Sequence, residues 1–419
     1  LIVAVAALAT SDSGGDDDLA DGGPPSTSVT NEPLAPDSTH PFEAPSLPSI
    51  PGLDPGAPGG DPQDQARPLD EVLPELIDFV ERTRGHRFRT EPVVEALADA
   101  EFEARLAEAQ AGEEDALRIE GVVDQALGLI PPGTDLAEVA GAAAAAVLGF
   151  YLPETGELLV RGDAVTPFVQ TVIVHELTHA LDDQYVDLGR LDALSEQPDE
   201  EAFGFLALVE GTARWVETSF RMQLTAEEQA AVDLEELQFG LDSVMDTLAV
   251  PPAYIVAAQI PYVAGLALVS DIVAEDGWRS IDAAYRAPPT TSEQVLDPDL
   301  YEAAEPAVAV NAPEADGAVV AEGAIGAVDL RLLEVATDPT GALVGGGQVE
   351  PLDGFGGGRF VSWEDGEEAC IRFRVVGDDA AGTAAIGEVL DTWSASEAGS
   401  GAQVDGGTAT EAFTVTRCA

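Results

Sequence analysis

The chain has 419 residues, of which 45% are hydrophobic, so it is long enough to fold around one large core or two smaller ones. It carries 78 acidic residues against 18 basic ones, all of them arginine, and its formal net charge is −60. Such a charge repels nucleic acids and anionic lipid surfaces, which argues against proteins that bind them. It suits a protein that stays soluble outside the cell or in high salt.

The N-terminal segment LIVAVAALATSDSGG is typical of the end of a signal peptide, because its apolar run closes on the small-residue pattern Ala7-Leu8-Ala9. A clipped membrane anchor is the alternative. We expect residues 1–9 to be a signal-peptide remnant and the protein to be secreted or associated with the cell envelope. Residues 10–67 are rich in Asp, Gly, Pro and Ser, which predicts a disordered acidic stalk.

Helical periodicity begins near Leu69 and continues to about Leu129. The residue pattern then changes from helical to strand-like. Two short strands are predicted at Leu148–Tyr151 and Glu157–Val160, on either side of a Pro-Glu-Thr-Gly turn.

The next helix is predicted to start after Thr166, a favourable N-cap, with Pro167 at the first helical position, and to run to about Tyr185. A further helix is predicted to start near Pro198. The uncharged run at 247–270 is long enough for a membrane span, but its three prolines favour helices buried inside a domain.

The C-terminal part, after about residue 303, is Gly-rich and strand-like. Its two cysteines, Cys370 and Cys418, border alternating segments, and in an exported chain they are expected to form one disulfide. The fold class predicted for the chain is α+β: a mainly helical domain with a small edge sheet at 68–305, followed by a smaller α+β domain at 306–419.

The segment VIVHELTHALDDQY contains an H-E-x-x-H array made of His175, Glu176 and His179, in a chain with only four histidines. Residues four apart on a helix share one face, so both imidazoles can reach one ion while the glutamate projects beside them. In metallopeptidases zinc lowers the pKa of the water that it holds, and the glutamate takes the proton from that water. Two helix histidines that merely form hydrogen bonds are the alternative.

A catalytic zinc ion needs a third protein ligand. Glu210 is the best candidate, because it lies in the strongly apolar run LALVEGTARW, where an unpaired carboxylate would be costly to bury. Gly211 would let this helix approach the motif helix. A salt bridge from Glu210 to Arg214 is the rival interpretation, and an arginine could also orient a ligating carboxylate. Glu217, two turns later, is the substitute ligand.

Three more residues are candidates for supporting roles. Asp182 and Asp183 follow His179 by three and four residues and could accept its imidazole N–H, although a solvated acidic helix end would also explain them. Tyr262 in IPYVAG could donate a hydrogen bond to a developing oxyanion, although an ordinary core tyrosine is the simpler interpretation.

The HELTHA motif with a glutamate on the next helix resembles the gluzincin arrangement of zinc metallopeptidases. The chain also resembles, more closely than it does the thermolysin-like enzymes, a group of poorly characterised exported bacterial HExxH proteins. The shared segments are VLGFYLPETGEL, HELTHALDDQ, ALVEGTA, IPYVAG, APPTTSEQVLDPDLY and GFGGGRF. That group has His where Asp297 stands here, and GWGGDR where this chain has Phe355 and Gly358. The resemblance implies a zincin-like fold and peptide hydrolysis. It also implies zinc ligands at His175, His179 and Glu210 and a general base at Glu176.

The sequence thus predicts an exported zinc metallopeptidase with one Zn²⁺ per chain. Glu176 would activate the zinc-bound water, and the substrate would be a peptide or protein. No nucleic-acid partner and no stable membrane span in the mature chain are expected. The alternative is a catalytically silent envelope or peptide-binding protein that zinc stabilises.

Overall fold

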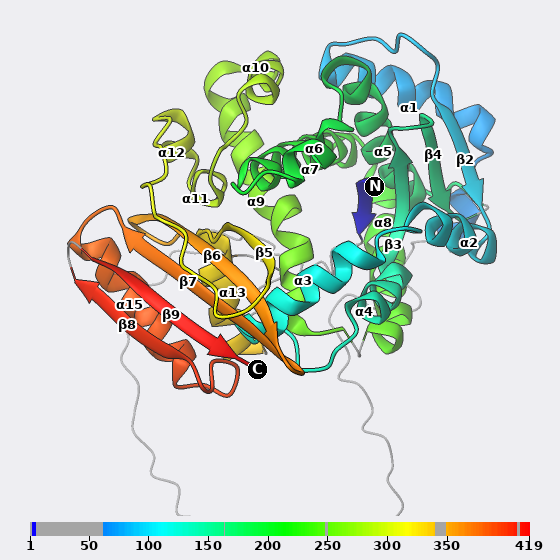
Figure 1. Cartoon of the computed structure of the whole chain (residues 1–419). Coiled ribbons are helices and arrows are strands. Elements are labelled where there is room, and N and C mark those ends of the chain that lie inside the picture. Colours follow the sequence, from blue (N-terminus) through cyan, green and yellow to red (C-terminus); the bar gives the residue numbers. More distant parts are fainter. Residues whose placement is uncertain (1, 6–61, 163, 248–249, 340–348, 409–410) are drawn as a thin grey trace, which may run out of the picture. The chain divides into compact units, whose positions relative to one another are not determined.

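The computed structural model describes residues 2–5, 62–162, 164–247, 250–339, 349–408 and 411–419 (Figure 1). The described residues belong to one compact unit. The predicted stalk therefore lies outside the described residues up to position 61. The described part has helices and two small sheets, which confirms the α+β class.

The elements follow one another in this order. Up to the motif helix they are β1 (Ile2–Val5), η1 (Pro62–Gln65), α1 (Leu69–Arg84), β2 (Val93–Leu97), α2 (Asp99–Ala109), α3 (Glu114–Leu127), α4 (Leu136–Ala143), η2 (Ala144–Ala146), β3 (Val147–Leu152), β4 (Glu157–Arg161) and α5 (Pro167–Val186). The helices that follow are α6 (Arg190–Ser195), α7 (Glu201–Arg221), α8 (Ala226–Thr247), α9 (Pro252–Asp276), η3 (Trp278–Ser280), α10 (Ile281–Arg286), α11 (Ser292–Leu296) and α12 (Pro298–Glu302). The C-terminal elements are β5 (Val319–Ala324), α13 (Ala327–Thr337), β6 (Phe355–Asp365), β7 (Glu368–Gly377), α15 (Ala380–Ser394), β8 (Gln403–Thr408) and β9 (Glu411–Cys418).

The first sheet has four strands in the order β1-β3-β4-β2. The predicted hairpin is confirmed as β3 and β4, which pair antiparallel, and Gly156 in the connecting turn has a φ of 72° that suits glycine. Strand β2 pairs parallel with β4. The sequence VVEAL was predicted as part of a continuous helical stretch, and this prediction is wrong: its β-branched start pairs with the long-range partner β4 instead.

The N-terminal apolar run enters the same sheet. Its residues 2–5 form β1 and pair antiparallel with β3, with Ala4 opposite Gly149 and Val3 opposite Phe150. This run was expected to be a signal-peptide remnant, and that assignment stays a prediction. What the structure adds is that the outer edge of β3 accepts an extended backbone.

Helix α5 packs against β3 and β4 of this sheet, and its residues from Pro167 to Asp182 are all buried. Its expected start is confirmed, because the Thr166 side chain accepts a hydrogen bond from the Val169 amide and Pro167 occupies the first turn. A hydrophobic cluster joins α5 to α1 and to the β3/β4 hairpin, and α5 also contacts α7 and α8. The motif helix is therefore enclosed by neighbours rather than lying on the surface.

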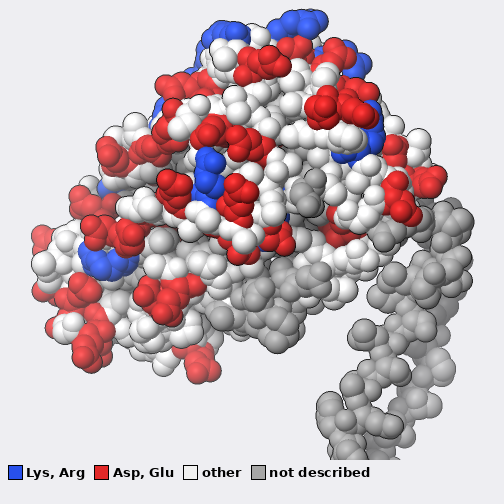
Figure 2. Space-filling model, turned by 90° about the vertical axis from the view of Figure 1, so that its right-hand side faces the viewer, with Lys and Arg blue, Asp and Glu red and all other residues white. Residues whose placement is uncertain are grey.

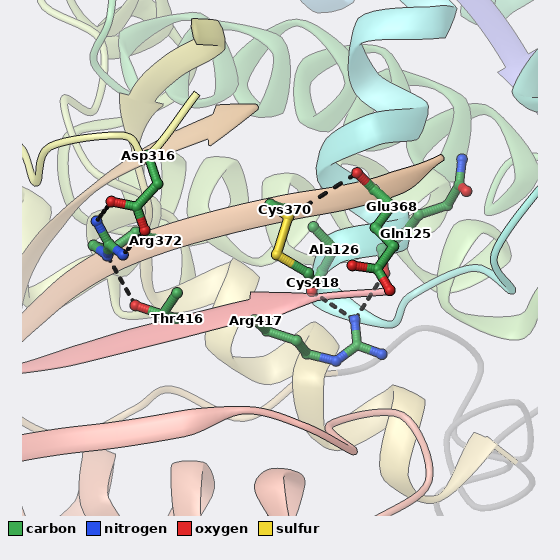
Figure 3. The surroundings of a disulfide bond; sticks show 9 residues. All are labelled: Gln125, Ala126, Asp316, Glu368, Cys370, Arg372, Thr416, Arg417 and Cys418. Atoms are coloured by element: carbon green, nitrogen blue, oxygen red, sulfur yellow. Dashed lines mark hydrogen bonds and ion pairs between the residues drawn. A yellow bond between two sulfur atoms is a disulfide. The ribbon is translucent and has the colours of Figure 1, made fainter. Parts of the chain in front are cut away.

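The C-terminal sheet has five antiparallel strands in the order β5-β6-β7-β9-β8 (Figure 1, yellow to red). The expected disulfide is confirmed: Cys370 on β7 and Cys418 on β9 are direct cross-strand neighbours (Figure 3). Next to it, Arg417 donates to the carbonyl oxygens of Gln125 and Ala126 at the end of α3, as Figure 3 shows.

Trp393 of α15 donates its indole N–H to the Leu127 carbonyl. Together with Arg417, it satisfies backbone carbonyl groups at the C-terminal end of α3. One hydrophobic cluster contains residues of α3 and α9 together with residues of α13, α15 and the second sheet. The core therefore runs across the predicted boundary at residues 305 and 306. That boundary stays a prediction.

Two surface properties concern possible partners. Figure 2 shows one face on which Asp and Glu side chains far outnumber Arg, as the composition requires. Within the described residues, α9 is the one helix long and apolar enough to cross a membrane by length and composition. It is continuous through Pro261, and it packs against α7 and α13.

Candidate metal centre

The H-E-x-x-H array lies in the middle of α5. The rings of His175 and His179 are one turn apart, with their centroids 4.7 Å from each other. All three residues of the array are buried: His175 and His179 are 1% exposed and Glu176 is 0% exposed. The helical spacing therefore places both imidazoles on one inward face, as the sequence predicted.

Glu210 comes from the middle of α7 and faces both rings. Its Oε2 atom lies 3.2 Å from His175 Nε2 and 3.5 Å from His179 Nε2, and the side chain is 2% exposed. Among the described residues, these three form the one group whose ligand atoms all lie within 4.8 Å of one another. The predicted set is thus brought together in space.

The distances from Glu210 Oε2 to the two ring nitrogens fit a single tetrahedral ion. Two ligands bound at roughly 2.0 to 2.2 Å from such an ion are themselves roughly 3.3 to 3.5 Å apart. The 3.2 and 3.5 Å separations between Glu210 Oε2 and the two ring nitrogens agree with this. His179 Nε2 is also buried without a hydrogen bond to any described residue, and a metal ion would satisfy it. Two imidazoles and a carboxylate are donors that suit zinc among other divalent ions.

Electrostatics tie the three groups together. Burial opposes the charge of His175, but its hydrogen bonds to Glu210 and Glu217 outweigh burial and raise its pKa to about 9. Burial lowers the pKa of His179. Burial also opposes ionisation of Glu210, yet the two histidines hold its pKa at about 2. Because Glu210 stays ionised, it is ready to bind a cation.

Glu176 projects toward the first sheet. A Cβ atom on Gly149 of β3 would lie 3.1 Å from Glu176 Cγ and 3.3 Å from its Oε1. Gly149 therefore leaves the room that the glutamate side chain occupies. The general-base candidate lies directly beside the strand whose outer edge carries β1.

Gly211 was expected to let its helix approach the motif helix, and this prediction is wrong, because the helix next to Gly211 is α9. A Cβ atom there would lie 2.2 Å from backbone atoms of Gly265, so Gly211 allows α7 to pack closely on α9 rather than on α5. A Cβ atom on Gly265 would meet the Ala207 carbonyl at 2.1 Å. This close crossing sets the position of α7, and with it the position of Glu210.

Arg214 does not form the salt bridge with Glu210 that was the rival interpretation of this segment. Its Nη1 atom donates to both carboxylate oxygens of Glu217 at 2.9 Å. Glu217 Oε2 in turn lies 3.2 Å from His175 Nδ1, on the opposite side of the ring from Glu210. Burial opposes ionisation of Glu217, but Arg214 and His175 hold its pKa at about 2. The sequence offered Glu217 only as a substitute ligand, and the structure places its carboxylate at His175 Nδ1 instead, outside the group of converging ligand atoms.

The two aspartates after the motif also have partners other than those expected. Asp182 accepts hydrogen bonds from Arg84 and from the Tyr285 hydroxyl, rather than from His179. The reason is electrostatic, since Arg84 is 1% exposed and needs a buried counter-charge.

Asp183 accepts a hydrogen bond from the Tyr151 hydroxyl at 2.8 Å and one from the Leu188 amide. It therefore joins α5 to β3 instead of orienting an imidazole. Both aspartates hold the motif helix in place, and neither makes a hydrogen bond to His179 within the described residues.

Tyr262 of α9 is brought to the site. Its ring is stacked beside that of His175, with centroids 6.1 Å apart. Burial, together with the charges of Glu210 and Glu176, raises its pKa well above the ordinary value. The phenol thus keeps its proton at neutral pH and can donate a hydrogen bond. The tertiary structure alone ties Tyr262 to this centre.

The chain was compared with known proteins at three levels. No protein-family model matches it, and none of the curated proteins or solved structures matches it either. The function of the centre therefore has to be inferred from its own geometry.

Proposed function

We propose that this chain is a zinc metallopeptidase with the gluzincin arrangement and a zincin-like fold around α5 and α7. The observation that carries the proposal is the convergence of His175, His179 and Glu210 in one buried cluster, with Glu176 beside it. Three protein ligands leave one position open, which is typical of catalytic zinc sites, whereas structural sites have four.

The roles of the side chains follow from their chemistry. His175, His179 and Glu210 would hold the ion, which when bound would polarise the scissile carbonyl and acidify a water molecule. Glu176 accepts the proton of the attacking water and passes it to the departing amine. Tyr262 keeps its proton and donates a hydrogen bond to the carbonyl oxygen as negative charge develops there.

A peptide is the substrate class that the first sheet supports best. The outer edge of β3 pairs with an extended segment, β1, and Ala4 of that segment lies opposite Gly149, the residue that packs on Glu176. Addition of a strand to a sheet edge is a general mode of peptide recognition, because the main-chain hydrogen bonds are independent of sequence. A substrate on this edge would have its backbone next to the general base.

The burial of the centre favours a second function. The two histidines, Glu176 and Glu210 are each at most 2% exposed, as expected for an ion that stabilises a fold without turnover. In that case the protein would be a zinc-stabilised envelope or peptide-binding protein. The two functions share the metal and differ only in whether Glu176 acts as a base.

Glu176→Gln separates them, because this change removes the base and keeps all three ligands. The purified protein should hold about one zinc per chain by elemental analysis, and it should cleave members of a broad quenched-peptide library. Glu176→Gln should keep the zinc and lose cleavage, whereas Glu210→Ala should lose the zinc. A parent protein that holds zinc but cleaves no peptide would leave the stabilising role as the answer.

A further inference from the structure

We propose that Glu217 is a positioning residue that fixes His175 with its Nε2 atom turned toward the metal. The inference rests on the proposed metal centre. It begins with one contact: Glu217 Oε2 lies 3.2 Å from His175 Nδ1, and both side chains are buried. An ionised carboxylate only accepts hydrogen bonds, so the Nδ1 atom must carry the hydrogen. The Nε2 atom is then the nitrogen that presents a lone pair to a metal ion.

The same ring meets a carboxylate at each of its nitrogens. His175 Nε2 is 3.2 Å from Glu210 Oε2, on the side where His179 also lies. Glu210 and Glu217 are seven residues apart, which brings both onto one face of α7 about 10.5 Å apart along the helix axis. The imidazole of His175 lies between their carboxylate groups. One helix thereby supplies a metal ligand and the group that sets the tautomer of another ligand.

Arg214 holds Glu217 in this position. It lies between the two glutamates in the sequence, and its Nη1 atom donates to Oε1 and Oε2 of Glu217 at 2.9 Å each. The Oε2 atom is therefore shared between Arg214 and His175. This contact keeps Glu217 from turning toward the ion and satisfies the charge of a buried carboxylate.

This geometry also shows that Glu217 is not placed to act as the substitute metal ligand. Its oxygen faces the ring nitrogen that points away from His179 and Glu210, so it does not belong to the group of three converging ligand atoms. Hydrogen bonds of this kind from a ligating imidazole to a carboxylate fix the ring and increase its basicity. Glu217 therefore acts on the metal through His175.

The test compares zinc affinity by chelator competition in the full-length chain. Glu217→Gln should weaken zinc binding by roughly 10- to 100-fold, because the amide forms a weaker hydrogen bond with Nδ1 and can present its N–H instead. Glu217→Asp keeps the charge but draws the carboxylate away from the ring, and it should fall between the parent and Glu217→Gln. If Glu217→Gln folds poorly, Glu217→Asp alone still tests the role of the carboxylate, because it should bind zinc more weakly than the parent.

Glu236→Gln is the matched control. Glu236 of α8 accepts a hydrogen bond from Arg221 of α7, and its side chain is 12% exposed. Among the described residues it makes no hydrogen bond or ion pair with His175. This variant should bind zinc as the parent does. Long-range ¹H–¹⁵N correlation spectra of the zinc-loaded protein provide a readout that a purely structural role would not change. They should show His175 protonated at Nδ1 in the parent and a shifted or mixed signal in Glu217→Gln.

The outcomes separate this inference from the proposed function. Unchanged zinc affinity and an unchanged His175 signal in Glu217→Gln would overturn the role of Glu217, whether or not the parent cleaves peptides. A parent that binds zinc and cleaves nothing would refute the peptidase, while a loss of affinity in Glu217→Gln would still support the positioning role. A parent that binds no zinc would overturn both.

Discussion

Glu210 Oε2 lies 3.2 Å from His175 Nε2, although the two residues are 35 positions apart and belong to different helices. Both side chains are almost fully buried. A contact of this kind depends on how α5 and α7 are held by their neighbours, α9 and α1 among them.

Gly211→Ala should destabilise the fold and weaken metal binding. The new methyl group would lie 2.2 Å from backbone atoms of Gly265, and backbone cannot move aside as a flexible side chain can. We expect a loss of about 1 to 3 kcal/mol in the free energy of unfolding, measured by urea denaturation, with α7 displaced from α9. Gly141→Ala on α4 is the control, because nothing lies within 4 Å of its added Cβ and alanine favours helix. Equal stability of the two variants would contradict the close crossing.

Arg84→Met should cost roughly 3 to 5 kcal/mol of stability, because it leaves the buried Asp182 carboxylate without its main counter-charge. Replacing both residues, Arg84→Met with Asp182→Leu, should recover part of the loss. Arg67→Met breaks an exposed ion pair with Glu75 and should change stability far less, because solvent screens both charges. Thermal or urea unfolding measures all three. A small effect of Arg84→Met alone would show that the pair does not hold α1 to the motif helix.

The metal-free protein should lose stability as the pH rises from 6.5 to 9. His175 has a folded-state pKa of about 9, above its ordinary 6.5, so its contribution is complete below pH 6.5 and disappears as pH passes 9. Below pH 4.5 a second loss should begin, because Glu210 has a pKa of about 2 in the folded state. Urea unfolding in the presence of a chelator measures both slopes.

Zinc supplies the control for this pH dependence. An ion would take the place of the proton on His175, so the part of the loss between pH 6.5 and 9 that His175 causes should vanish in the zinc-loaded protein. The part due to the buried carboxyls of Asp124 and Glu293, whose pKa values burial raises to about 8, should remain. His175→Gln should likewise remove the His175 part of the slope from the metal-free protein. The same slope in parent and His175→Gln would assign it to another group.

The edge of β3 should bind an extended peptide through its backbone. A variant that starts at residue 11 should bind the free peptide LIVAVAALAT, measured by fluorescence anisotropy. In an antiparallel pair alternate residues direct their N–H groups at the neighbouring strand. Two modified peptides test this: one is N-methylated at Ile2 and Ala4, and the other at Val3 and Val5. One of them should lose binding, and the other should bind like the unmodified peptide. Equal effects of both sets would mean that the peptide binds without forming a strand.

The local parts of the site could be predicted from the sequence. Thr166 and Pro167 mark the start of α5, and the four-residue spacing of His175 and His179 places both rings on one face, because capping and helical periodicity act within a few residues. Glu210 could be chosen because a lone carboxylate in an apolar helix needs a compensating partner. The disulfide followed from the same kind of local pattern.

Only the tertiary structure decided which groups meet across elements. Arg214 turned out to hold Glu217, Asp182 to hold Arg84, and Gly211 to contact α9, although the sequence suggested other partners for each. Periodicity tells which face of a helix is buried, but the partner on that face depends on how the helices cross. That crossing is set by close backbone contacts and buried charge pairs between segments far apart in the chain, which no local pattern records.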